Sequence, residues 1–181
     1  MNTPTTITKE PIVVVASILQ SELGLDDAHI MLEYQKNFIP KDSALYTALV
    51  YLGPGKLIAN INETQATDDG LIEIQSLTMQ HMIQVDFMSF SSEARIRKEE
   101  FYMALNSVYS EQQQELYQMM IAKNPGPFID AGSFEATAFL NRFTTVVPVH
   151  AVHRKEKPVT YFNQFGAEFA TETSGFVTVN P

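Results

Sequence analysis

Strict alternation of hydrophobic and polar residues marks the segment Leu77–Phe87. Its odd-numbered positions are apolar apart from His81, and its even-numbered positions are mostly polar. Successive side chains on a strand point to opposite faces, so the pattern predicts a long strand with one buried face and one face turned to solvent or to a partner. Met82 and Met88 lie on the polar side and are candidate interface residues, because methionine makes adaptable contacts.

A second long strand is predicted over Asn141–Val152, where alternate residues from Phe143 to Ala151 form one face. Pro148 lies inside this segment and has no N–H to donate, which favours an edge strand or a bulge. The polar run His153–Pro158 is expected to be a turn. Val159–Phe165 is then expected to return as the partner strand of a hairpin.

Other segments have helical spacing. Pro11 suits the first turn of a helix and Gly24 its end. Two central helices are predicted, over Glu93–Tyr109 and from the capping-box-like Ser110 to Ala122. The side chains expected to point inward from these two helices are Ala94, Phe101, Leu105, Val108, Leu116, Met119 and Met120.

Shorter strands are expected at 29–34, 44–52 and 56–62, and the polar segment 63–70 ends in Asp68-Asp69-Gly70, a strong turn signal. This order predicts an α+β fold in which the N-terminal helix and the two central helices pack on a mostly antiparallel sheet. The chain has 181 residues, a length typical of one domain. We expect this domain to span 9–165, after a flexible arm at 1–8 and before a C-terminal tail at 166–181.

The tail contains a short β-prone segment that includes Phe176 and Val177. Two interpretations stay open for it. Terminal segments are commonly disordered, but a β-prone segment can also add a strand to a neighbouring subunit. Phe176 and Val177 are therefore candidate interface residues.

Composition narrows the possible functions. The formal net charge is -9, so binding of duplex DNA through phosphate neutralisation is not expected. The chain has no cysteine, which excludes thiolate nucleophiles, thiolate zinc sites and disulfides. No apolar stretch approaches the roughly 20 residues that span a bilayer, and we expect a soluble, intracellular protein.

Two basic clusters stand out against the acidic background. Arg95, Arg97 and Lys98 belong to the first central helix, and Arg154, Lys155 and Lys157 belong to the expected hairpin turn. Such clusters are usually solvated charge. The alternative is electrostatic docking to an acidic neighbour, which could be another copy of the chain.

No motif in the sequence demands catalysis, a metal or a cofactor. His150 and His153 would point to opposite faces of a strand, and His81 is expected to be a core histidine bonded to a backbone partner. The rival hypothesis is a small hydrolase that uses His81 or His150 with Asp86 or Asp130. No spacing among these residues requires them to meet, so no catalytic, cofactor or metal residue is predicted.

Three stretches resemble one protein family in their order and spacing. They are Glu33–Pro40, the pair Gln84–Met88 and Ser91–Arg95, and Leu140–Val147. Together they resemble the tail terminator proteins (neck, or head–tail joining proteins) of tailed bacteriophages over roughly residues 10–165. Where that family often has a tyrosine–glycine pair after the second strand motif, this chain has Met88-Ser89-Phe90.

The resemblance implies a structural virion protein without catalysis or cofactor, located in the phage neck or tail and assembled in the host cytoplasm. It implies a homo-hexameric ring that stops growth of the tail tube and joins the tail to the head. The implied partners are the tube protein, the sheath where there is one, and a head-completion or connector protein. DNA would pass through the lumen without specific binding, and an acidic lining would favour this; Glu63, Asp68 and Asp69 are candidates. A protein-binding adaptor that pairs through an edge strand is the alternative.

Overall fold

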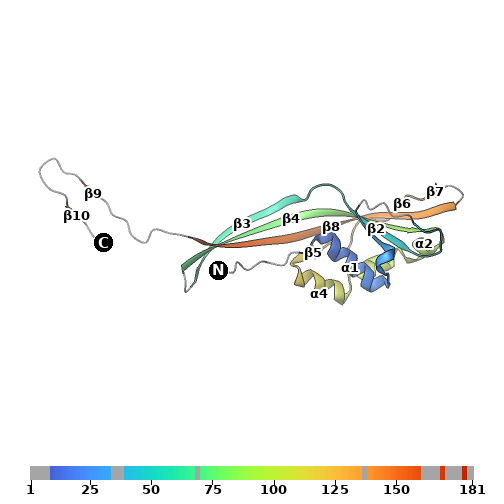
Figure 1. Cartoon of the computed structure of the whole chain (residues 1–181), viewed down its shortest axis with the longest axis horizontal. Helices are drawn as coiled ribbons and strands as arrows, with labels where there is room; N and C mark the ends of the chain where they lie inside the picture. The colour runs from blue at the N-terminus through green and yellow to red at the C-terminus, as the bar shows by residue number, and fades with distance from the viewer. Residues whose placement is uncertain are drawn as a thin grey trace.

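The computed structural model describes residues 9–33, 39–67, 70–135, 138–159, 168–169 and 177–178. It has the predicted α+β fold with a mostly antiparallel sheet (Figure 1). The main sheet has the order β1 (Ile30–Leu32), β2 (Tyr46–Tyr51), β4 (Gly70–Ser89), β8 (Ala138–Val159) and β5 (Met119–Ile121). The remaining strands are β3 (Lys56–Thr67) beside β4, β6 (Ile129–Asp130) and β7 (Ser133–Glu135) beside β8, and a separate antiparallel pair, β9 (Glu168–Phe169) with β10 (Val177–Thr178).

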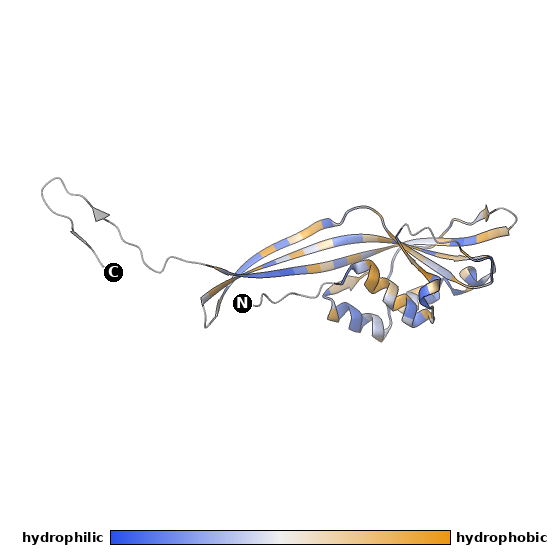
Figure 2. Ribbon diagram, in the orientation of Figure 1, coloured by the Kyte–Doolittle hydropathy of each residue, from blue (hydrophilic) through white to orange (hydrophobic). Residues whose placement is uncertain are grey.

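β4 and β8 form the spine of the sheet. They pair without interruption from Leu71 opposite Val159 to Ser89 opposite Asn141. Both predicted strands lie within this pair, and the alternation of hydrophobic and hydrophilic residues is visible along them (Figure 2). The polar segment that begins at Glu63 is strand through Thr67, and Thr67 pairs with Gly70, which agrees with the turn signal between them. The predicted turn at His153–Pro158 is wrong, because β8 continues through Val159. These segments are polar because solvent reaches them, and their backbones are nevertheless paired.

Pro148 lies in the middle of the sheet, so the predicted edge position is wrong. The N–H of Ala122 donates to the carbonyl of Pro148 at 3.0 Å. On a strand, the nitrogen and carbonyl of one residue point to the same side, so the proline nitrogen faces away from β4. Its missing N–H therefore removes no hydrogen bond from the β4–β8 ladder.

Helix α1 (Pro11–Leu23) covers one face of the sheet as predicted, and it ends where Gly24 adopts a left-handed φ of 63°. Its β-branched residues remain helical because burial outweighs their modest intrinsic preference for strands. Val14, Val15 and Ile18 are fully buried against the inner face of β4 and β8, which presents Val85 and Val147 to the core.

The central helical region is divided differently from the prediction. It contains three helices, α2 (Glu93–Arg97), α3 (Glu100–Leu105) and α4 (Val108–Leu116), and the segment expected to complete the last helix forms β5. Ala94, Phe101, Leu105 and Met119 are buried as expected. Val108, Leu116 and Met120 are exposed, which corrects their inward assignment.

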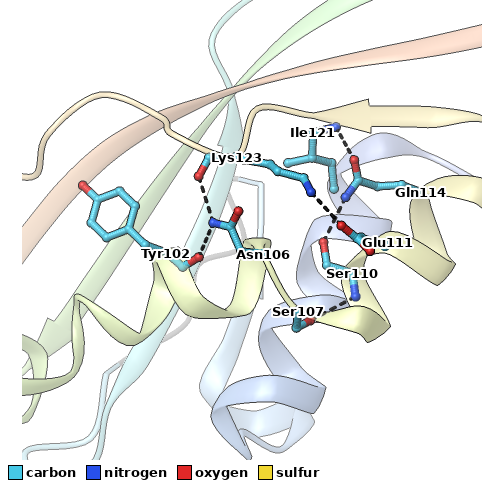
Figure 3. A network of polar contacts seen from close by, with 8 residues as sticks. All are labelled: Tyr102, Asn106, Ser107, Ser110, Glu111, Gln114, Ile121 and Lys123. Atoms are coloured by element: carbon cyan, nitrogen blue, oxygen red, sulfur yellow. Dashed lines mark hydrogen bonds and ion pairs between the residues drawn. The ribbon is translucent and has the colours of Figure 1, made fainter.

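A polar network explains where α4 begins and ends (Figure 3). Ser107, and not Ser110, caps the helix, because its hydroxyl accepts from the N–H of Ser110 at 3.0 Å. The side chain of Gln114 then accepts from the N–H of Ile121 at 2.8 Å. This bond holds β5 beside α4 after the chain turns at Gln118, whose φ is 52°. A helix continued to Ala122 would lose this contact.

Phe101 is the centre of an aromatic group in the core. It is fully buried, and its ring lies 5.7 Å from the rings of Phe87 and Phe128 in edge-on geometry. We predict that Phe101→Ala lowers the free energy of unfolding by about 3–5 kcal/mol. Met103→Ala, on the exposed side of the same helix, should change it by less than about 0.5 kcal/mol. Urea denaturation measures both, and equal effects would contradict this view of the core.

Candidate functional site

The most unusual surface is a three-stranded part of the sheet, which we call the arm. It consists of residues 56–67 of β3, 70–80 of β4 and 150–159 of β8, held by the pairings of β4 with both neighbours. Figure 1 shows the arm extending past the helices, which lie beneath the remainder of the sheet. At about 3.3 Å per residue its strands are about 40 Å long.

The arm is a single layer for most of its length. Every position of β3 is exposed except Ala59, which is half-buried. Leu57, Ile58 and Ile61 on this strand are 53%, 49% and 52% exposed. Domains are normally built from at least two packed layers, so a single-layer arm with three exposed apolar residues is a candidate contact surface.

The basic residues of the arm are partly used within the chain. Lys157 pairs with Glu73 at 2.8 Å across β4 and β8, and Arg154 pairs with Glu156 at 2.9 Å. The hydrogen bond from Lys157 holds the pKa of the Glu73 carboxyl below its usual value, with further help from Gln75. Lys155 is exposed. The predicted cluster therefore lies on a strand and not at a hairpin tip.

The other predicted basic cluster is largely structural. Arg97 donates to the carbonyl of Leu23 at 2.8 Å and pairs with Glu100, which ties α2 to the end of α1. Lys98 lies 5.3 Å from the centre of the Phe143 ring. Arg95 is exposed and is the member of this cluster that remains a candidate for a partner.

The two methionine candidates differ. Met82 is 38% exposed, beside the base of the arm. Met88 is only 6% exposed and packs with Met31, Tyr46 and Leu140 on the face of the sheet opposite α1. Its assignment to an interface is therefore corrected: residues from β1, β2 and β8 already cover it.

The tail candidates are placed only in part. Val177 lies in β10, opposite Phe169 of β9. Phe176 lies outside the described residues, as do Asp68 and Asp69, two of the acidic lumen candidates. Glu63, the third, is exposed on β3. Of the expected returning strand, only Val159 is described, and it ends β8.

An aromatic patch that the sequence did not indicate lies at the end of the molecule opposite the arm (Figure 1). Phe134 on β7 is 82% exposed, and its ring lies 5.1 Å from that of Phe139 on β8 in edge-on geometry. Ile129 on β6 is also exposed. The segment 128–139 has no regular alternation of apolar and polar residues that would predict this hairpin.

His81 lies in a pocket of about 400 Å³ between the base of the arm and the start of α1. Its ring lies 5.6 Å from that of Tyr51, and Gly55 leaves no room for a Cβ beside it. Nε2 of His81 is buried without a hydrogen-bond partner among the described residues, and the residue is half-buried and not in the core as expected. Burial, followed by repulsion from His153, lowers the pKa of His81.

Asp86 is buried and its carboxylate is fully engaged. Arg142 pairs with it at 2.6 Å, Gln84 donates to it at 2.9 Å, and Thr144 also donates to it. These partners come from β4 and β8 alone. The arrangement locks the two strands on the face opposite α1.

The residues of the hydrolase hypothesis are not brought together. Asp86 lies opposite Thr144, and Asp130 lies opposite Phe143. His81 and His150 are five to seven residues away along the paired strands, which corresponds to about 15–25 Å. Over the described residues, no group of three or more His, Asp or Glu side chains is arranged to hold a metal ion.

Comparison with known proteins finds no family for this chain. No family model matches the chain, and no curated protein matches its sequence. Within the described part of the chain, no helix is both long enough and apolar enough to cross a membrane.

The Asp86–Arg142 pair provides a stability prediction. Arg142→Ala leaves a buried carboxylate without its cation, so we expect the free energy of unfolding to fall by about 2–4 kcal/mol. Arg154→Ala, which removes an exposed ion pair, should cost less than about 1 kcal/mol. Chemical denaturation distinguishes the two, and similar costs would show that Asp86 is not stabilised by Arg142.

His81 provides a pH prediction. Its pKa is lower in the folded chain than in the unfolded chain, so the unfolded state takes up a proton first as the pH falls through about 6.5. The free energy of unfolding should therefore decrease between pH 7 and pH 5. His81→Gln, which cannot titrate, should flatten this slope. An unchanged slope in the variant, measured by urea titration at each pH, would contradict it.

Proposed function

We propose that the chain is a structural virion protein that assembles with copies of itself into a ring. In this proposal it is a tail terminator that caps the tube of a phage tail and joins it to the head. The observation that carries the proposal is the arm: a long, single-layer sheet with exposed apolar residues on its outer strand. The sequence resemblance over roughly residues 10–165 supplies the virion context.

An exposed single layer favours assembly because exposed apolar side chains gain stability only when another surface covers them. Each Å² of apolar surface removed from water contributes about 25 cal/mol. Leu57, Ile58 and Ile61 are half exposed in the single chain, so the described part of the chain does not cover them. The described residues place no helix over β3.

The distribution of patches favours a head-to-tail contact. The arm lies at one end of the main sheet and β7, which carries Phe134, at the other (Figure 1). Unlike surfaces that meet in succession generate a closed ring or an open filament, whereas one self-complementary surface generates a dimer. A ring of six copies is the stoichiometry that the family resemblance implies.

A protein-binding adaptor remains the second candidate, and a specific observation favours it. β3 is an edge strand over its full length among the described strands. An adaptor would pair this edge with one partner protein and stay monomeric or dimeric. Light scattering of the purified chain separates the two candidates, since only the ring gives a mass several times 20.3 kDa.

The arm generates a prediction about assembly. Leu57→Ser combined with Ile61→Ser should reduce the assembled fraction by at least tenfold, while the melting temperature of the single chain stays within a few degrees. Both side chains are exposed in the single chain, so their loss weakens only contacts between copies. Native mass spectrometry measures the assembled fraction, and negative-stain microscopy shows whether it is a ring.

Met103→Ser is the matched control. Met103 is 73% exposed, but it lies on α3, away from the arm. It should leave the oligomer unchanged. A wild-type chain that stays monomeric in solution and in assembled phage particles would refute the proposed function, and equal loss in the control would remove the arm from the interface.

A further inference from the structure

The outer edge of β3 has free backbone groups. The N–H of Leu52 donates to the carbonyl of Met82, so even-numbered residues of β4 direct their backbone groups toward β2 and β3. In the register of the arm, these residues lie opposite odd-numbered residues of β3 from Ala59 to Thr67. The even-numbered residues therefore direct their N–H and C=O groups away from the sheet. They are Asn60, Asn62, Thr64 and Ala66.

The other edge of the arm is different. By the same alternation, the even-numbered residues of β8 direct their backbone N–H and C=O groups away from β4. The bond from the N–H of Val152 to the carbonyl of Gln118 shows this. Pro158 therefore places its missing N–H on this outer edge. Arg154, Lys155 and Lys157 add charge to the strand. Proline and lysine are the features that protect natural edge strands from unwanted pairing.

β3 lacks this protection. Its twelve residues contain no proline, and its only charges are Lys56 and Glu63. The contrast matters because both edges belong to one arm. Protection of one edge and not the other indicates that β3 is the edge built to receive a strand.

The sequence also contains a strand that could be donated. β8 ends at Val159, opposite Leu71, which in turn lies opposite Ala66 of β3. The chain after Val159 thus leaves from the same end of the arm as the end of β3. A segment as long as residues 160–175 spans at most about 50 Å when fully extended, which is longer than the arm itself.

Within one chain, this strand does not occupy the edge. Val177 and Thr178 of β10 pair with Phe169 and Glu168 of β9, and neither short strand pairs with β3. These residues are nevertheless extended and able to pair. We propose that β3 of one copy receives the segment around Val177 from a second copy as an added strand. This deepens the proposed function, on whose self-assembly it rests.

The experiment uses the absence of cysteine from the chain. In the full-length Val177→Cys variant, the new thiol is first converted to a mixed disulfide with thionitrobenzoate. This protein is then mixed with a second full-length variant, Thr64→Cys. Attack of the Cys thiolate at position 64 on the activated sulfur forms the cross-link between copies and releases coloured thionitrobenzoate. Lys155→Cys is the matched acceptor control, because Lys155 is exposed on β8 at a similar distance along the arm.

We expect release with Thr64→Cys to be at least tenfold faster than with Lys155→Cys, and to give a covalent product of twice the chain mass. Equal rates would overturn the proposal. If a double variant carrying Thr64→Cys and Val177→Cys instead forms its disulfide within one chain, and mixing gives none, the donor is not a second copy and the proposal is also wrong.

A proline pair checks the same edge by another route. Thr64→Pro removes an outward N–H from β3, whereas Glu156→Pro removes one from the already interrupted edge of β8. The first should reduce the assembled fraction at least tenfold and the second should not; circular dichroism verifies that both fold. A ring with equal cross-linking rates would leave the proposed function standing and reject strand addition. Fast cross-linking without a ring would support strand addition and reject the ring of the proposed function.

Discussion

The continuous antiparallel pairing of β4 with β8 is the interaction on which the rest of the molecule depends. α1 packs on one face of this pair, and the Met31–Met88 cluster covers part of the other. β2 and β3 pair with β4, and β5, β6 and β7 pair with β8. Because the two strands continue well beyond the helices, the same pairing creates both the packed core and the uncovered arm (Figure 1).

The sheet thus changes character along its length. Near the helices, Ile83, Val85 and Val147 are fully buried, and Asp86 is compensated by Arg142. Along the arm, cross-strand pairs such as Glu73–Lys157 face solvent. Backbone hydrogen bonds, and not a second layer, hold the arm together. This is why we place the interaction surface there, and why the chemistry of the edges decides which contacts it can make.

The parts of the fold that the sequence predicted are those with strong periodicity. The faces of β4 and β8 and the limits of α1 follow from alternation, from Pro11 and from the left-handed Gly24. The continuation of β3 from Glu63 to Thr67 and of β8 to Val159 could not be predicted, because a strand exposed on both faces has no apolar pattern. β5 was missed because it depends on a tertiary contact. The side chain of Gln114 accepts a hydrogen bond from the N–H of Ile121, which stabilises the turn after α4.

The roles of the candidate interface residues were predicted less well, because they depend on contacts between residues that are remote in sequence. Arg97 and Lys98 carry charge, but their partners Leu23 and Phe143 are remote in sequence, so their structural role was hidden. Phe139 lies next to the start of β8 and Val159 ends it. One uninterrupted strand therefore joins the Phe134–Phe139 pair to the arm, so a partner of either end contacts the same element of secondary structure.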